Sequence, residues 1–142
     1  MSPSTLSAVI EGIHNGASPE VVLSQFITAF DIALTDAARY AIIEQEPALT
    51  DDGRLNALAG ALAEYLAKQH KLDRVPPWAS SPARCLERPW HTSSIAVDWR
   101  REYLTGGVRE YLTFSSPAEF ASRNIFTEEA PLRWVRRAPE IS

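Results

Sequence analysis

The sequence predicts a mostly α-helical, compact multi-helix domain that contains, at most, a small β hairpin. Apolar residues recur at helical spacing in several segments, capping residues stand where those segments begin, and prolines or glycines stand where they end. The chain has 142 residues, of which 45% are hydrophobic and 23% charged, as in ordinary globular proteins. A domain of this length buries roughly 70% of its unfolded surface, which is enough for a real core.

Three parts of this domain differ in composition. Residues 1–71 are expected to form an acidic helical layer, 72–93 an irregular crossover rich in proline and tryptophan, and 94–142 an Arg-rich helical part. Residues 1–66 hold nine acidic and two basic residues, whereas 67–142 hold nine acidic and twelve basic residues. Charge asymmetry of this kind is typical of two faces with different partners, or of two halves that attract each other.

The N-terminal helices are predicted from their boundaries. An apolar face with the spacing i, i+3, i+4, i+7 starts at Leu6, and Asn15-Gly16 ends that helix. Ser18-Pro19 starts the second helix, because serine caps an orphan N–H and proline suits the first turn. Thr35-Asp36 either begins a third helix or continues the second. Pro47 ends the run, because the residue before a proline is pushed out of helical geometry.

The segment after Asp52, "GRLNALAGALAEYLAKQHKL", is predicted to be a long capped helix. Its leucines form a stripe, its small residues allow a neighbouring helix to approach closely, and its basic end suits the negative helix terminus.

The crossover carries two Pro-Trp pairs, which end at Trp78 and Trp90. Pro76 and Pro77 hold the backbone near extended polyproline geometry, and Ser81-Pro82 caps a short turn. Two interpretations stay open. Each tryptophan either anchors the crossover on the helices or lies in a patch that faces a partner.

The C-terminal part is predicted to hold three further segments. Residues 93–104 are expected to be helical, while 108–114 fit either a strand or a helix. Ser116-Pro117 is expected to start another helix with Glu119 in a capping box, and Asn124 to end it. A last capped helix is expected from Thr127.

The stretch "SSPAEFASRNIFTEEAPLRW", with "LAEYLAKQHKLDRVPPWASSPARCLERPWH" before it, resembles a pattern in small bacterial proteins associated with toxin-antitoxin pairs. The likeness covers about residues 58–134. It implies an antitoxin-like component that accompanies a nucleotidyltransferase-like toxin. Cys85 stands where an aromatic residue is usual, and no helix-turn-helix is recognisable, so a repressor role is not implied.

No catalytic or metal-binding signature is present, so neither an enzyme nor a metal or cofactor is expected. His14, His70 and His91 lack the spacing of a metal site, and Cys85 with His91 lacks the third group that orients a nucleophile and its base. Cys85 is expected to be a buried thiol, because free cysteine commonly packs inside. No apolar run approaches the ~20 residues of a membrane span, and no signal peptide is evident, so a cytoplasmic location is expected.

We therefore predict a non-catalytic protein-binding module, an antitoxin-like protein that neutralises a cognate bacterial toxin by direct binding. The alternative is nucleic-acid binding or regulation through the Arg/Trp-rich C-terminal half, with Arg109, Arg123 and Arg133 among the bases. The partner's identity and any homo-oligomer stay open. The residues expected to contact the partner are Trp78, Trp90, Arg100, Arg101, Trp134, Arg136 and Arg137.

Overall fold

The computed structural model describes residues 5–92 and 102–132. Their elements are α1 (Leu6–His14), α2 (Pro19–Ile32), α3 (Asp36–Glu44), α4 (Gly53–Gln69), the 3-10 turns η1 (Pro77–Ser80) and η2 (Pro82–Arg84), β1 (Trp90–His91), α5 (Gly107–Ser115), α6 (Ala118–Ala121) and β2 (Ile125–Phe126). The prediction of a mostly α-helical domain is confirmed.

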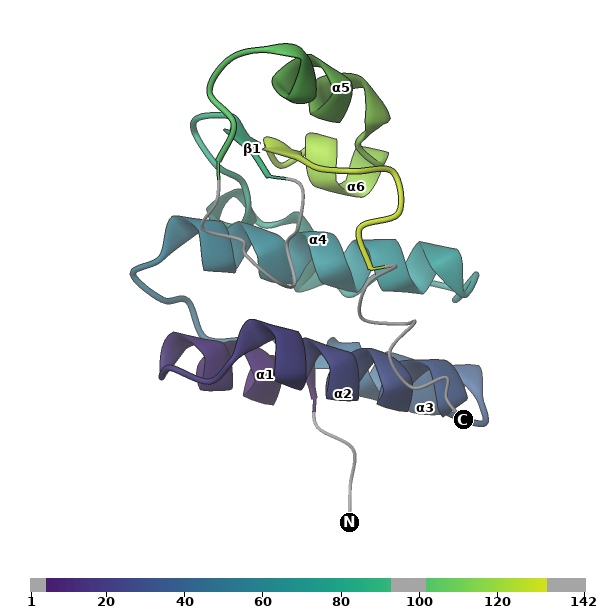
Figure 1. The fold of residues 1–142 in the computed structure, drawn as a ribbon. Coiled ribbons are helices and arrows are strands. Elements are labelled where there is room, and N and C mark those ends of the chain that lie inside the picture. Colours follow the sequence, from purple (N-terminus) through teal and green to yellow (C-terminus); the bar gives the residue numbers. More distant parts are fainter. Residues whose placement is uncertain (1–4, 93–101, 133–142) are drawn as a thin grey trace.

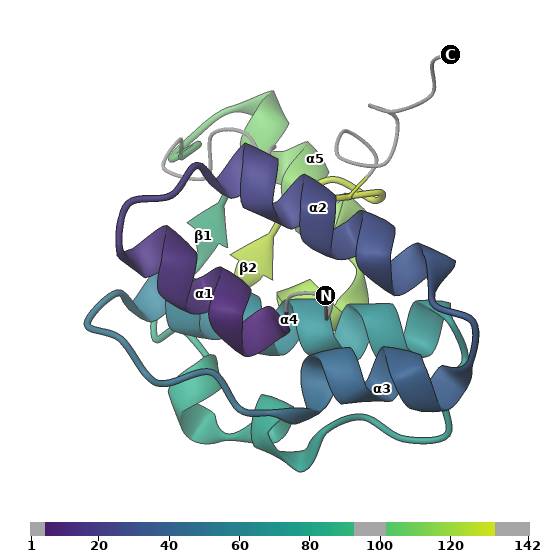
Figure 2. The ribbon, with the colours of Figure 1, turned by 90° about the horizontal axis from the view of Figure 1, so that it is seen from below.

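Helix α4 runs through the middle of the molecule (Figure 1). Helices α1, α2 and α3 cover one side of it, as Figure 2 shows from below, and the short strands with α5 and α6 lie on the opposite side. One buried apolar cluster runs through these layers, from Leu6 in α1 to Leu132 near the end of the described chain.

Local capping chemistry sets the starts of the first three helices. The hydroxyls of Thr5, Ser18 and Thr35 accept hydrogen bonds from backbone N–H groups in the first turns of α1, α2 and α3. Thr35 therefore begins a third helix, which decides between the two alternatives left by the sequence. Gly16, at a φ of 107°, follows the end of α1 in the left-handed region that favours glycine.

Helix α4 is covered on nearly all sides, which explains its composition. The carboxylate of Asp52 accepts from the N–H groups of Arg54 and Leu55 and caps the helix, as predicted. Leucines and alanines are buried around the whole circumference, a pattern typical of a central helix rather than a surface one. The crossover packs against α4 through η1 and η2.

The small sheet is parallel, so the predicted hairpin is wrong in its topology. Trp90 pairs with Ile125 and His91 with Phe126, and the two strands are separated by α5 and α6. Parallel strands require a crossover connection, which no local turn signal reveals. Residues 108–114 lie in α5 and are helical, which resolves the ambiguity between strand and helix.

Two further predictions in the C-terminal part are corrected. Pro117 rather than Ser116 is the residue before α6, and no side chain caps that helix. The Ser116 hydroxyl instead donates to carbonyls of Leu112 and Thr127. The helix expected from Thr127 does not form over 127–132, because this segment packs as buried, irregular chain. Asn124, at a φ of 66°, ends the preceding turn as predicted.

Candidate protein-docking surface

An apolar stripe is exposed on the outer side of α5 and the turn before it. The side chains of Leu104, Val108, Tyr111 and Phe114 are 72%, 49%, 53% and 87% exposed. Val108, Tyr111 and Phe114 stand three residues apart within α5, which places them along one side of that helix, and Leu104 lies in the loop before it. We call this set the α5 stripe. It lies on the far side of α4 from the N-terminal helices (Figure 1).

The side of α5 next to the stripe is held on the sheet. Leu112 is buried, and the Thr113 hydroxyl donates to the carbonyl of Arg109 and lies 2.9 Å from His91 Nε2. Because that hydroxyl proton is already used, His91 is the donor in this pair. At the end of the helix, the Ser115 hydroxyl donates to the Thr127 carbonyl at 3.0 Å. The stripe therefore stands on an anchored helix.

His91 connects α5 to both strands. Its ring stacks on Phe126, with centroids 4.8 Å apart, and its carbonyl accepts from the N–H of Tyr103. Burial lowers the pKa of His91, the nearby guanidinium of Arg109 lowers it further, and Glu102 opposes this weakly. The neutral imidazole is therefore the form that suits this site.

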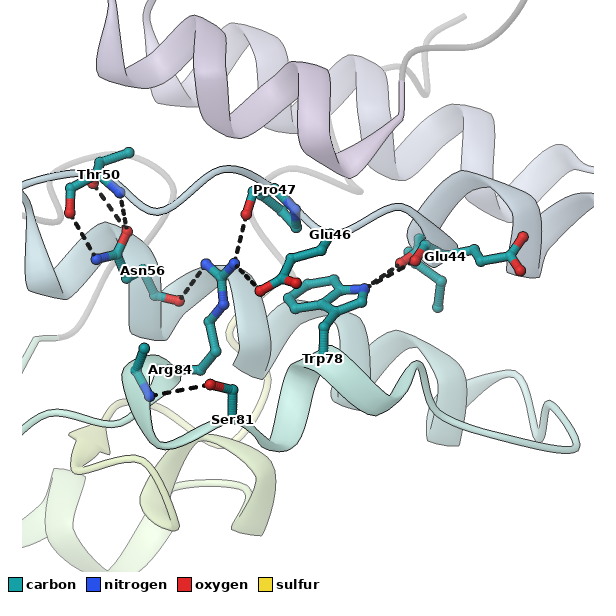
Figure 3. Close-up of polar contacts among 10 residues, drawn as sticks. Glu44, Glu46, Pro47, Thr50, Asn56, Trp78, Ser81 and Arg84 are labelled. Carbon is teal, nitrogen blue, oxygen red and sulfur yellow. Dashed lines mark hydrogen bonds and ion pairs between the residues drawn. The ribbon is translucent and has the colours of Figure 1, made fainter.

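Trp78 anchors the crossover on the helices (Figure 3). Its indole N–H lies 3.2 Å from the carbonyl of Ile43 and 3.1 Å from that of Glu44, at the end of α3. The guanidinium of Arg84 lies over the Trp78 ring, 5.0 Å from the ring centroid. The half-buried ring thus binds the chain's own α3, as the anchoring interpretation of the sequence requires.

Arg84 is a fully buried cation that the sequence reasoning missed. It donates to the Glu46 carboxylate at 3.0 Å and to the Pro47 carbonyl at 2.6 Å, and it lies 3.5 Å from the Asn56 carbonyl (Figure 3). Arginine suits this position because its planar fork reaches several acceptors at once. In the sequence, the small residues of α4 indicated only that another segment can approach this helix closely. They did not indicate that the segment carries a buried arginine.

A second buried arginine, Arg123, lies on the same side of α4. It donates to Glu64 and to the carbonyls of Glu119 and Ala79, each at 2.7 Å. Burial acts to raise the pKa of Glu64, but hydrogen bonds from Lys68 and Arg123 outweigh it and hold that pKa below its ordinary value. Arg123 therefore belongs to the core and not to a basic nucleic-acid surface.

Trp90 is also an internal residue. Its ring is 1% exposed and carries the guanidinium of Arg54 at 4.9 Å, and Arg54 pairs with Glu102 at 2.9 Å. A partner has no direct access to this ring, so the anchoring interpretation holds here as well. The other predicted contact residues lie outside the described residues: Arg100, Arg101, Trp134, Arg136 and Arg137.

Cys85 is exposed, so the predicted buried thiol is wrong. It directly follows the 3-10 turn η2, and the inward position at the end of that turn is taken by the buried Arg84. The ring of His91 is buried against Thr113 and Phe126 instead of being paired with this thiol. The two residues do not form a nucleophile and its base.

Two clefts lie in the N-terminal layer, away from the α5 stripe. One, of about 310 Å³, is lined by Asp36, Ala37, Tyr40, Glu44, Leu72, Asp73 and Arg74, and the guanidinium of Arg74 covers the Tyr40 ring at 4.4 Å. The other, of about 230 Å³, lies between the end of α1 and the segment before α4. In the described ranges, no three histidine, cysteine or acidic side chains are grouped to hold a metal ion.

Within residues 5–92 and 102–132, no helix combines the length and apolarity needed to cross a membrane. Comparison of the chain with protein-family models, with curated proteins and with solved structures finds no match.

Proposed function

We propose that this protein is a non-catalytic protein-binding module that contacts its partner through the α5 stripe. The proposal includes the finer expectation from the sequence, an antitoxin-like protein of the cytoplasm that neutralises a cognate bacterial toxin by direct binding. The observation that carries the binding function is the exposure of Val108, Tyr111 and Phe114 along one side of an anchored helix, with Leu104 also exposed in the loop before it.

The size of the stripe supports a binding role. Its exposed apolar area is on the order of 500 Å² when the fractions are applied to ordinary side-chain areas, and patches of that size on monomers often mark interaction sites. Single exposed apolar residues are common and need no explanation, but Val108, Tyr111 and Phe114 lie on one helix, three residues apart. Tyrosine in particular is enriched among residues that dominate binding energy.

The anchoring of α5 on the rest of the protein supports the same role. Hydrogen bonds from His91 and Ser115, with the buried Leu112, hold the helix before any partner arrives. A preformed surface loses little conformational entropy on binding, so more of the contact energy contributes to affinity. A toxin bound here is blocked sterically, with no chemistry required of this chain.

The test is capture of the product of the neighbouring gene by the tagged full-length protein. We expect the unsubstituted chain to retain that product and Phe114→Ser to lose it. Leu34→Ser is the matched control, since Leu34 is also a highly exposed apolar residue but lies between α2 and α3. Equal retention by both variants contradicts the proposal. Salt-sensitive retention of RNA or DNA, unchanged in Phe114→Ser, favours the nucleic-acid alternative instead.

A further inference from the structure

We infer that the α5 stripe receives a basic amphipathic helix of a partner protein. This inference rests on the proposed function and names the chemistry of the partner. It comes from the charged residues around the stripe, because the exposed ones are acidic.

Two exposed carboxylates lie on α5 and on the segment that is bonded to its end. Glu110 lies within α5, one residue before Tyr111. Glu129 lies two residues beyond Thr127, whose carbonyl is bonded to Ser115 at the end of α5. Neither Glu110 nor Glu129 forms an ion pair with another residue in the described part of the chain. Both are therefore available to basic side chains of a partner.

Within residues 5–92 and 102–132, other charges near α5 do not reverse this balance. Arg109 is half-buried and lies on the side of His91, where it acts on the imidazole. Glu102 is paired with Arg54. The free carbonyls at the C-terminal end of α5 add partial negative charge close to Phe114. A basic ligand is attracted to the carboxylates Glu110 and Glu129, whereas nucleic acids and anionic lipid surfaces are repelled by them.

A helix is the partner element that fits the shape of the stripe. Three of the apolar side chains, Val108, Tyr111 and Phe114, repeat every three residues along α5. A second helix with apolar residues at the same spacing packs its ridges against such a row, and its flanking lysines or arginines reach Glu110 and Glu129.

A second copy of this chain fits less well. Two copies of Glu110 come close together when two such stripes pair, and each chain carries a net charge of −4. The stripe also provides on the order of 500 Å², below the ~800 Å² per partner of a standard stable interface. A partner with basic residues adds contacts at the rim that a second copy lacks.

The experiment measures binding of two labelled synthetic peptides to the full-length protein by fluorescence anisotropy. Both peptides are amphipathic helices with the same leucine stripe, one with lysines and one with glutamates on the polar face. We expect the Leu/Lys peptide to bind, with an affinity that falls as salt is raised, and the Leu/Glu peptide not to bind. Equal binding of both, or binding of neither, overturns the inference.

Variants of the chain locate the site. Phe114→Ser is expected to weaken binding of the Leu/Lys peptide about 30-fold, the loss typical of a central contact residue. Glu110→Gln combined with Glu129→Gln is expected to weaken it about 5-fold and to reduce its salt dependence. The matched control, Glu20→Gln with Glu44→Gln, removes two exposed carboxylates of the N-terminal layer and is expected to change nothing. Equal losses in the two double variants overturn the inference.

Two further outcomes separate this inference from the proposed function. If the neighbouring gene's product is lost by Phe114→Ser but retained fully by Glu110→Lys with Glu129→Lys, the binding function stands and the basic partner helix is wrong. If the chain alone sediments as a dimer that Phe114→Ser dissociates, a second copy occupies the stripe and the inference is again overturned.

Discussion

Helices α4 and α5 are both rich in apolar residues, yet only one of them is covered by its own chain. Around α4, the N-terminal helices, the crossover and α6 bury side chains on all faces. Around α5, the sheet covers one side, where Leu112 packs, and Tyr111 and Phe114 stay in contact with solvent. With a similar apolar content, α4 contributes to the core, whereas α5 leaves an exposed surface for another molecule.

The two helices also differ in the charged residues around them. The neighbours of α4 bring two arginines, Arg84 and Arg123, into the core, where Glu46 and Glu64 balance them. The rim of α5 leaves carboxylates exposed. Changes beside α4 are therefore expected to alter stability, and changes on the outer side of α5 to alter binding.

Arg84→Ala is expected to lower the free energy of unfolding by about 3 kcal/mol, since it leaves a cavity and removes the donor to the buried Pro47 carbonyl. Urea unfolding measures the change. Glu46→Gln is the control: the Glu46 side chain is 50% exposed, so its charge is worth less than about 1 kcal/mol. Equal effects of the two substitutions contradict a buried, structural role for Arg84.

Gly60→Ala is expected to cost about 1 to 2 kcal/mol of stability, despite the better helix propensity of alanine. A Cβ at this position meets Arg84 Cβ at 2.9 Å, Arg123 Nε at 3.0 Å and the Ala79 carbonyl oxygen at 3.1 Å. Gly107→Ala is the matched control in α5, where a Cβ has open space and alanine is expected to stabilise by up to about 1 kcal/mol. Thermal unfolding of both variants distinguishes a crowded helix from an uncrowded one.

His91 is expected to make stability depend on pH below its ordinary pKa of 6.5. Its folded pKa is lowered, first by burial, so the unfolded chain binds the proton more readily. The contribution is complete above pH 6.5 and is lost as the pH falls from there toward the folded pKa, with a slope of at most about 1.4 kcal/mol per pH unit. Urea unfolding at pH 7.5 and 5.5, compared with His91→Gln, measures it. An unchanged pH dependence in the variant counts against this role.

Phe114→Ser is expected to change the free energy of unfolding by no more than about 0.5 kcal/mol, because the ring is 87% exposed. The same variant is the one expected to lose partner binding. Circular dichroism at increasing temperature checks the first statement on the protein used for capture. A large loss of stability contradicts the assignment of Phe114 to a free surface.

The sequence predicted much of the helical framework correctly, because caps and stops act within a few residues. Ser18, Thr35 and Asp52 each accept a hydrogen bond from a backbone N–H two or three residues ahead, so their effect is visible in the order of residues alone. Asn124 ends its turn for a similarly local reason. The capping box expected at Ser116 failed because Thr127, far along the chain, engages its hydroxyl.

The candidate site was not predicted from the sequence. Their size and the neighbouring prolines predict the crossover tryptophans as possible contacts, yet Trp90 is enclosed and Trp78 binds α3. The α5 stripe was overlooked because residues 108–114 fitted no single period. Its exposure depends on which side of the helix the sheet covers, and periodicity alone does not reveal that.

The sequence by itself determined a mostly helical domain, the starts of α2 and α4 and the irregular crossover, since these depend on contacts between near neighbours. Only the tertiary structure decided that Arg84 and Arg123 lie inside, that Cys85 is exposed and that the strands run parallel. Whether an arginine can be buried depends on carboxylates and carbonyls that the fold brings to it, among them Pro47, 37 positions from Arg84, and Glu64, 59 positions from Arg123. The same long-range packing left one side of α5 without a partner in the described part of the chain.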